Sequence, residues 1–256
     1  MKKVLPAIIV LLLLPSCISK SIKYIQDKNE IFEQVYEYDN HPADYKIQKQ
    51  DILYVKITST NKDINEYFNL SSRTNTNNIQ NANFYLDGFT VSDSGYINVP
   101  VLGKLLVEGL TVKEANDLLQ QKTDEHLNNA IATLKLVSFY IDFLGEVRKQ
   151  GRVTVMQDNI NILDAIAMAG GINDFGDKRN VLVVRKTKDG TKTFRVGLTE
   201  RDLLTSDKFY LLPYDMVIVE PVANKTFRMN ITDYTLILTT LTSTITMVLL
   251  ILNLTK

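Results

Sequence analysis

The chain contains no tryptophan, only one cysteine and two histidines, and it carries no net charge. Its 29 lysines and arginines balance 29 aspartates and glutamates over 256 residues. A single cysteine cannot form an internal disulfide, and His41 and His126 lie far apart without the spacing of metal ligands. Balanced charge gives no electrostatic attraction toward nucleic acid. These absences exclude a disulfide scaffold and predict no metal site and no nucleic-acid partner.

Recognisable catalytic motifs are also absent. The sequence has no G-x-S-x-G segment and no phosphate-cradling loop, and Gly170-Gly171 is better explained as the end of a helix. The acidic residues are scattered, and a carboxylate pair for glycoside cleavage is the one enzymatic alternative left open. Asp93 and Asp215 lie in predicted turns, where a structural role is the stronger interpretation. We predict a protein that is not an enzyme, with no catalytic residues and no cofactor.

The first seventeen residues predict a lipoprotein signal. Two lysines precede an apolar stretch, and the chain's one cysteine, Cys17, follows Leu14 and Ser16 at the expected cleavage site. Residues 1–16 are therefore predicted to be a signal peptide, and Cys17 the lipidated first mature residue, because two acyl chains give stable anchoring. Ile18 provides no inner-membrane retention signal. The alternatives are a chance cysteine in an ordinary signal and an uncut signal anchor.

The other end of the chain is an uncharged apolar segment. Tyr234–Leu252 spans roughly one hydrocarbon core as a helix, so we predict a transmembrane helix within residues 225–256. Four threonines recur at helical spacing on one face of this segment, opposite branched aliphatic residues: Thr235, Thr239, Thr242 and Thr246. Such a stripe can face a water-filled lumen when several helices form a ring. The alternative is a plain single-pass anchor, in which each threonine hydroxyl bonds back to its own helix.

Between these ends the sequence predicts a tether over 17–43 and a first domain over 44–137. Alternating apolar residues predict strands over 53–57 and 130–137, and a long surface loop is expected over 58–83. A hairpin is expected between 89–91 and 96–100, turning at Asp93-Ser94-Gly95. After a strand over 104–107, Thr111 and Glu114 form a predicted capping box that starts a helix.

A second domain is predicted over 138–224. Strands are expected over 138–147, 152–156, 181–186, 192–196 and 210–219, with a helical turn at 198–204. Asn161 is the expected cap of a short helix over 162–169. One helix among several strands predicts a small α+β unit such as a β-grasp, so the fold class of the chain is α+β.

Several segments, taken in order, resemble the outer-membrane polysaccharide export proteins of the Wza type. They are Tyr45 to Val55, D-S-G-Y-I-N-V-P-V-L-G from Asp93, E-G-L-T from Glu108, G-E-V from Gly145, L-D-A-I-A-M-A-G-G from Leu163, and L-P-Y-D from Leu212. The motif positions, all expected to be structural, are Asp51, Asp93, Gly95, Pro100, Gly103, Gly109, Thr111, Gly145, Gly151, Gly170, Gly171, Pro213 and Asp215. Gln50 and Tyr214 replace a motif glycine, and Gln150 replaces a proline.

The resemblance implies an export domain followed by one SLBB domain, the soluble-ligand-binding β-grasp type. It further implies an outer-membrane lipoprotein, mostly periplasmic, that forms a homo-oligomeric ring, usually an octamer, as a channel for capsular polysaccharide or exopolysaccharide. An inner-membrane polysaccharide co-polymerase, often with a tyrosine kinase domain, is the implied partner. The alternative is a monomeric, membrane-anchored carbohydrate-binding module.

Overall fold

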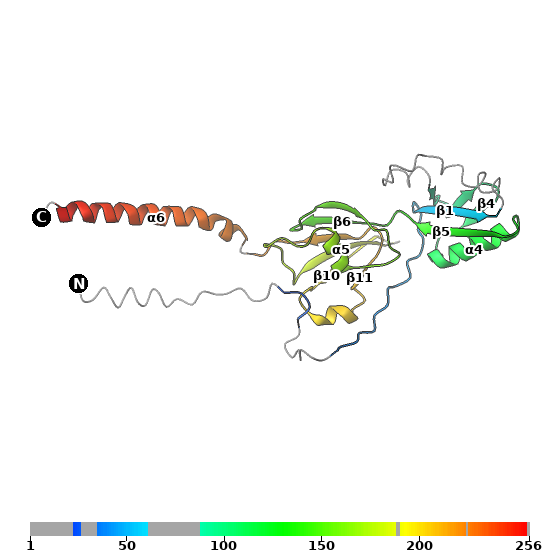
Figure 1. Cartoon of the computed structure of the whole chain (residues 1–256), viewed down its shortest axis with the longest axis horizontal. Coiled ribbons are helices and arrows are strands. Elements are labelled where there is room, and N and C mark those ends of the chain that lie inside the picture. Colours follow the sequence, from blue (N-terminus) through cyan, green and yellow to red (C-terminus); the bar gives the residue numbers. More distant parts are fainter. Residues whose placement is uncertain (1–22, 27–34, 61–87, 188–189, 224, 255–256) are drawn as a thin grey trace.

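The computed structural model describes residues 23–26, 35–60, 88–187, 190–223 and 225–254, with only the backbone for 225–235. Three units follow one another along the long axis: a first domain, a second domain and the long helix α6 (Figure 1). Each domain has its own cluster of buried apolar residues. Each also combines a helix with mostly antiparallel strands, so the α+β class is confirmed. The predicted signal peptide, Cys17 and residues 61–83 of the predicted loop lie outside the described residues.

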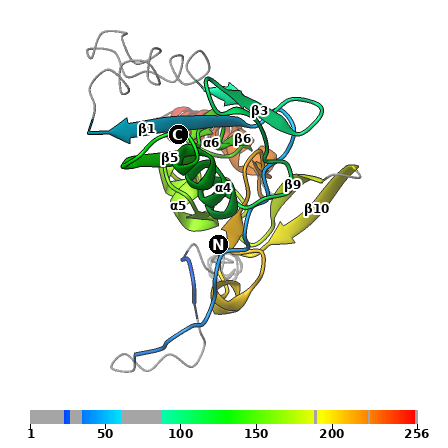
Figure 2. The same cartoon turned by 90° about the vertical axis from the view of Figure 1, so that its right-hand side faces the viewer.

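The first domain packs one helix against an antiparallel sheet. Its elements are β1 (Ile52–Ser59), β2 (Phe89–Thr90), β3 (Tyr96–Val99), β4 (Gly103–Leu106), α4 (Val112–Asp124) and β5 (Ala130–Leu136). The sheet order is β2-β1-β5, β3 and β4 form a separate ribbon, and α4 lies beside β5 (Figure 2). The predicted capping box is confirmed: Glu114 N donates to Thr111 Oγ1 at 3.1 Å, and Thr111 N donates to Glu114 Oε2 at 2.7 Å.

The predicted pairing of the first hairpin is wrong, although its turn is correct. Gly95 N donates to Ser92 O at 2.8 Å, and Gly95 has a φ of 83°. The strands on either side do not pair with each other, because β2 pairs with β1 and β3 pairs with β4. Buried Val91 exchanges hydrogen bonds with Gln50 and Asp51, which holds the chain before the turn against the start of β1.

The second domain packs one helix against a five-stranded sheet. Its elements are β6 (Tyr140–Gly145), β7 (Gly151–Thr154), β8 (Ile160–Asn161), α5 (Ile162–Met168), β9 (Val181–Thr187), β10 (Gly190–Val196), the 3-10 helix η2 (Arg201–Thr205), β11 (Tyr210–Leu211) and β12 (Met216–Val219). The sheet order is β10-β9-β12-β6-β7, and only the central pair, β12 with β6, is parallel. The predicted cap is confirmed, since Asn161 Oδ1 accepts from Leu163 N and Asp164 N.

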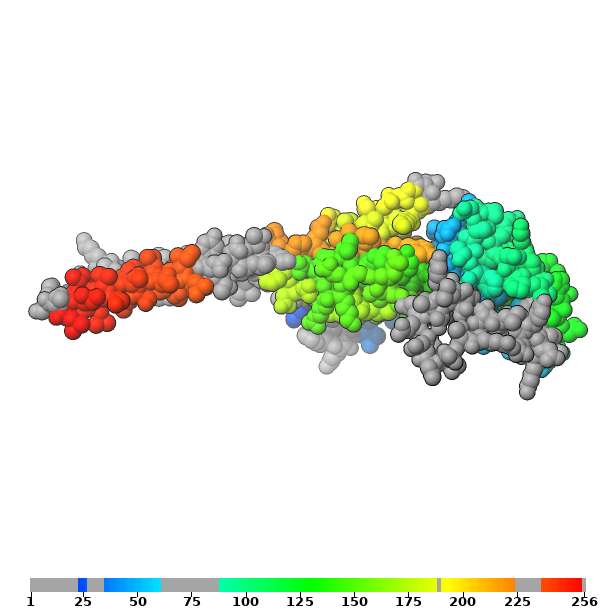
Figure 3. All heavy atoms as spheres, turned by 90° about the horizontal axis from the view of Figure 1, so that it is seen from above, coloured from blue at the N-terminus to red at the C-terminus, as the bar shows by residue number. Residues whose placement is uncertain are grey.

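The two faces of this sheet differ in what covers them. Alternate residues of β6, β9 and β12 are fully buried in the domain core, and their neighbours in sequence point to the opposite face. That opposite face, called here the open face, carries Leu144, Leu182, Val184, Met216 and Ile218. The strand register sets Ile218 between Leu182 and Leu144, and Met216 beside Val184. Figure 3 shows these strands side by side on the surface, in yellow, orange and green.

The last described element is the helix α6 (Lys225–Leu254), which projects from the second domain on the side away from the first (Figure 1). Residues Leu236–Leu254 are long and apolar enough to cross a membrane, and none of this span is buried within the molecule. The predicted helix over this segment is therefore confirmed. Its aliphatic side chains stay more than half exposed, so another surface must cover them.

Candidate functional site

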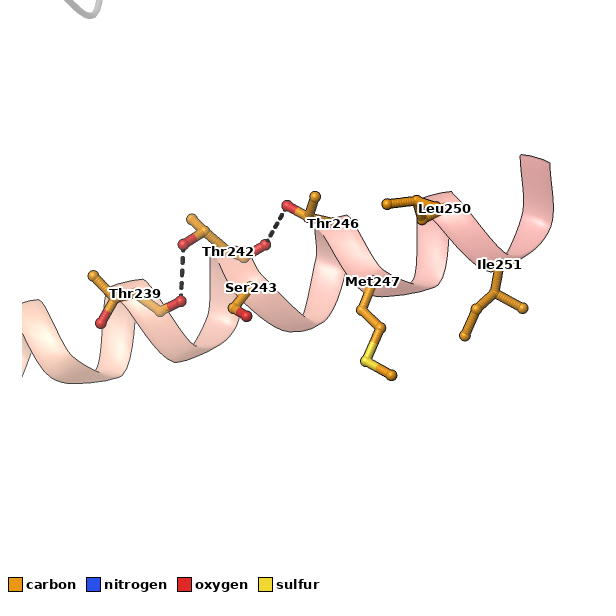
Figure 4. A pocket seen from close by; sticks show the side chains of 7 residues that line it. All are labelled: Thr239, Thr242, Ser243, Thr246, Met247, Leu250 and Ile251. Atoms are coloured by element: carbon orange, nitrogen blue, oxygen red, sulfur yellow. Dashed lines mark hydrogen bonds between the residues drawn. The ribbon is translucent and has the colours of Figure 1, made fainter. Parts of the chain in front are cut away.

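One face of α6 carries a shallow groove. It is lined by Thr239, Thr242, Ser243, Thr246, Met247, Leu250 and Ile251, which Figure 4 shows along one side of the helix. Three residues of the predicted stripe therefore share this face, and the side chain of Thr235 lies outside the described residues. The groove is polar in its first half and apolar in its second.

The hydroxyls of the three described stripe threonines donate to carbonyls of their own helix. Thr239 Oγ1 donates to Leu236 O at 2.9 Å, and Thr242 Oγ1 to Leu238 O at 3.0 Å. Figure 4 marks the two other bonds, from Thr242 Oγ1 to Thr239 O at 3.0 Å and from Thr246 Oγ1 to Thr242 O at 2.7 Å. Thr240 and Thr244, which lie off the stripe, form the same kind of bond. Because each hydroxyl hydrogen is used within the helix, the outward oxygen can only accept. The stripe offers acceptors to water or to sugar hydroxyls.

The aspartates of the two similar motifs, Asp51 and Asp215, occupy the same kind of turn. Each backbone N–H donates to the carbonyl three residues earlier, at 3.3 Å to Gln48 O and 3.2 Å to Leu212 O. Each carboxylate in turn accepts from the N–H of that earlier residue at 2.8 Å. Both side chains are fully buried. The two motifs therefore share one turn geometry.

The two departures from the motif glycine lie at the same position of these turns. Gln50 has a φ of 70° and Tyr214 a φ of 69°, the left-handed region that the third residue of a type II turn requires. A glycine adopts this conformation freely, whereas a residue with a Cβ is strained there by about 1–3 kcal/mol. Both turns therefore keep the backbone of the motif without its glycine.

Asp51 lies where the two domains meet and accepts hydrogen bonds from both. Tyr45 Oη donates to its Oδ2 at 2.9 Å, and Tyr214 Oη donates to its Oδ1 at 2.5 Å. Burial raises the pKa of Asp51 above its ordinary value, opposed by the hydrogen bonds from Gln48 N and the two phenols. Burial, and then the negative charge of Asp51, raise the pKa of both tyrosines. The phenols therefore stay protonated and act as donors.

Asp215 lies in the second domain and forms an ion pair with Arg185. Arg185 Nε donates to its Oδ1 at 2.9 Å, and Arg185 Nη2 donates to its Oδ2 at 2.7 Å. Burial raises the pKa of Asp215, while the guanidinium of Arg185 opposes that shift. Arg185 Nη2 also donates to Tyr210 O at 3.2 Å, which ties β9 to β11. The guanidinium binds both oxygens of the carboxylate, so we interpret this ion pair as structural.

The remaining motif residues lie in turns, at helix ends or in the core. The motif glycines with positive φ are Gly95, Gly103, Gly109, Gly145, Gly151, Gly170 and Gly171. At Gly145, an added Cβ would lie 2.1 Å from Val219 O, so only glycine fits beside β12. Asp93 accepts from Gln50 Nε2 at 3.0 Å on the surface, and Pro213 is buried in the turn before Asp215. Pro100 begins the turn between β3 and β4.

The described residues contain no group of three or more His, Cys, Asp or Glu side chains that could hold a metal ion. The acidic side chains of the motifs point into separate turns, so they form no facing pair. What the structure brings together instead is the junction of Tyr45, Asp51, Ser138 and Tyr214. Sequence reasoning missed this cluster. The one signal for it was the tyrosine at a glycine position.

Comparison with known families accounts for both domains. Residues 39–137 match the family model described as polysaccharide biosynthesis/export protein, and residues 138–219 match the SLBB domain. The two matches support a polysaccharide export protein of the Wza type with an SLBB domain. The chain is similar to the EPS I polysaccharide export outer membrane protein EpsA of Ralstonia nicotianae, 27% identical over 112 residues. It is also similar to the protein of that name from Ralstonia solanacearum, 28% identical over 107 residues.

These alignments cover 41% and 40% of this chain, and 29% and 28% of the two EpsA proteins. The chain therefore spans less than a third of the length of these curated members of the export family. The two family models together cover the described part of both domains. The resemblance predicted from the sequence motifs is confirmed at the level of the family.

Proposed function

We propose that the protein is a non-enzymatic outer-membrane lipoprotein that assembles into a ring and forms a channel for capsular polysaccharide or exopolysaccharide. The match of the first domain to the polysaccharide export family model and of the second to the SLBB domain carries this proposal. The names of the two relatives agree with it, since both are outer-membrane polysaccharide export proteins. Lipidation at Cys17 would fix the mature N-terminus in the same membrane that α6 crosses.

The helix α6 supports a channel over a plain anchor. A single spanning helix needs no polar face, yet Thr239, Thr242 and Thr246 form one opposite Leu241, Ile245 and Val248. In a ring of α6 helices the aliphatic side would face lipid, and the acceptor oxygens of the stripe would face water. Hydroxyl-rich polysaccharide can donate hydrogen bonds to such a surface.

The second domain supports assembly from several copies. We propose that it is a β-grasp, because its strand order is second, first, last, third, fourth along the chain, with α5 between the second and third strands. Its open face presents apolar side chains from three adjacent strands. We propose a neighbouring copy as the cover, because a closed ring uses different surfaces of each subunit and the proposed channel of α6 helices needs several copies.

Energy for transport must come from elsewhere, because the described residues offer neither a nucleotide loop nor a catalytic centre. We propose that an inner-membrane polysaccharide co-polymerase docks below the ring and delivers the polymer. The channel then acts as a passive, hydrated path.

The mass of the detergent-extracted protein tests the ring. We expect a large homo-oligomer for the full chain, persisting in a chain truncated before Lys225 if the domains hold the ring together. A monomer in gentle detergent would contradict the channel and favour the anchored carbohydrate-binding module. Incorporation of labelled palmitate into the wild type but not into Cys17→Ser tests the lipid anchor, and equal labelling of both would contradict it.

A further inference from the structure

The two domains are joined by a very short covalent link. Residues 137–139 connect the end of β5 to the start of β6. Leu136, just before this link, packs against the buried clusters of both domains, and Phe139, just after it, is buried in the second. The backbone therefore leaves little room between the domains, but three residues alone do not fix a rotation about the link.

A chain of hydrogen bonds crosses this link. Ile52 N donates to Ser138 Oγ at 3.1 Å, and Ser138 Oγ lies 2.6 Å from Tyr214 Oη. The phenol has a single hydrogen, which goes to Asp51 Oδ1, so the serine hydroxyl is the donor to the phenol oxygen. The order of donation is Ile52, Ser138, Tyr214, Asp51. It begins and ends in the first domain and passes through the link and the second domain.

Tyr214 is also held by its ring within the second domain. Its ring meets that of Tyr140 edge-on, with centroids 4.9 Å apart and an interplanar angle of 78°. Arg152 lies 3.5 Å above the Tyr140 ring and pairs with Asp142. The phenol is thus aimed at Asp51 from a fixed position on β6 and the turn before β12.

Gln50 provides an internal comparison for Tyr214. Both residues occupy the strained position of the same turn, at almost equal φ. The Gln50 side chain forms an exposed hydrogen bond with Asp93, within its own domain. The Tyr214 side chain is half-buried and reaches a fully buried carboxylate 163 residues away in the chain. Of these two residues, only Tyr214 uses its side chain for a contact between the two domains.

We propose that Tyr214 is a latch that fixes the orientation of the second domain relative to the first, through the hydrogen-bond chain from Ile52 and Ser138 to Asp51. The two domains then move as one rigid body, so a rotation of one in an assembly is passed to the other. The latch lies within one chain and does not depend on the number of copies or on transport.

The distance between the domains in the full-length protein tests the latch. Spin labels at Lys113→Cys on α4 and Met156→Cys after β7, both exposed, would report it in a Cys17→Ala background. Labelled chains are diluted with unlabelled chains so that only distances within one chain are measured. We expect a single narrow distance distribution for the parent, and at least a doubling of its width in Tyr214→Phe, which keeps the ring but removes the donor.

Two further variants separate the latch from the turn. Tyr214→Gly relieves the backbone strain and restores the motif residue, so the domain folds, yet we expect the same broadening. Gln50→Gly makes the same change in the first domain and is expected to leave the distribution unchanged. Parent-like widths in both Tyr214 variants would overturn the latch, as would equal broadening in Gln50→Gly. A monomer with a narrow distribution would contradict the channel and still support the latch.

Discussion

Asp51 and Asp215 are fully buried carboxylates in two turns of the same geometry, and only Asp215 faces a cation. Asp215 forms two hydrogen bonds with Arg185, whereas Asp51, within the described residues, forms no ion pair and is held by neutral donors. The two aspartates should therefore respond differently to loss of charge.

We expect Asp51→Asn to keep the fold at neutral pH, with stability equal to or above that of the wild type. Asparagine can accept from Gln48 N and Tyr45 Oη through its oxygen and donate to Tyr214 Oη through its nitrogen. Asp215→Asn should instead lower the free energy of unfolding by about 3 kcal/mol, because Arg185 is left partly buried without its counter-charge. Chemical denaturation of the two variants measures this contrast, and a larger loss in Asp51→Asn would refute it.

The pH dependence of stability tests the same carboxylate. Burial raises the pKa of Asp51 in the folded state, so the folded protein binds its proton more tightly than the unfolded chain. Protonated Asp51 therefore contributes to the free energy of unfolding. This contribution is fully present below the pKa of the aspartate in the unfolded chain, and it is lost as the pH rises through its pKa in the folded protein. The stability of Asp51→Asn relative to wild type should therefore increase as the pH rises from about 4. A difference that stays flat or falls over that range would contradict the assigned cause.

Gln50→Gly should raise the thermal stability of the protein. Glycine removes the strain of a φ of 70°. Its greater freedom in the unfolded chain offsets part of this gain, so the free energy of unfolding should rise by about 0.5–1 kcal/mol. The lost hydrogen bond to Asp93 is exposed and contributes little. Thermal unfolding measures the effect. A lower midpoint would mean that the Gln50 side chain contributes more than its surface position indicates.

The threonine stripe of α6 should matter for export, and the other threonines of the helix should not. Replacing Thr239 and Thr242 with leucine removes the acceptor oxygens from the proposed lumen, so polysaccharide should no longer reach the cell surface while the two domains stay folded. Thr240→Leu with Thr244→Leu is the matched control, since these threonines bond back to the helix in the same way on another face. Normal export in the stripe variant would count against a lumen-facing stripe.

The open face of the second domain should be required for assembly. Ile218→Glu places a charge among Leu144, Leu182 and Met216, and we expect it to dissociate the oligomer without unfolding the monomer. Thr193→Glu is the control, because Thr193 is exposed beside Val184 at the margin of the same face. The mass in detergent distinguishes the variants. An intact ring with Ile218→Glu would exclude this face as the contact between copies.

Local features of this fold could be predicted from the sequence, and contacts between distant segments could not. Thr111 and Asn161 cap their helices as predicted, because a cap depends on residues within three positions of each other. The strands were recognised from alternation, which tells which side chains are buried. Alternation does not tell which strand lies alongside, and for that reason β2 and β3 were paired with each other incorrectly.

The junction shows the same limit more sharply. The segments around Asp51 and Asp215 both contain an apolar pair followed by an aspartate and a strand, and in the structure both form the same type of turn. No local pattern relates Tyr214 to Asp51, because their contact depends on how two separately folded domains come together. A tyrosine at a position that favours glycine was the visible exception, and it marks the residue that joins the domains.

Both ends of the described chain attach to the second domain. Ile25 N and Gln26 N donate to Leu198 O and Thr199 O, and α6 follows directly after β12. Two segments of the chain therefore connect the first domain to the second, one that leads into β1 and one that follows β5. The hydrogen bond from Ile52 N to Ser138 Oγ joins these two segments. A polymer that pulls on the first domain would stretch these two connecting segments in parallel. The hydrogen bonds of the junction would bear this force before it reached the membrane.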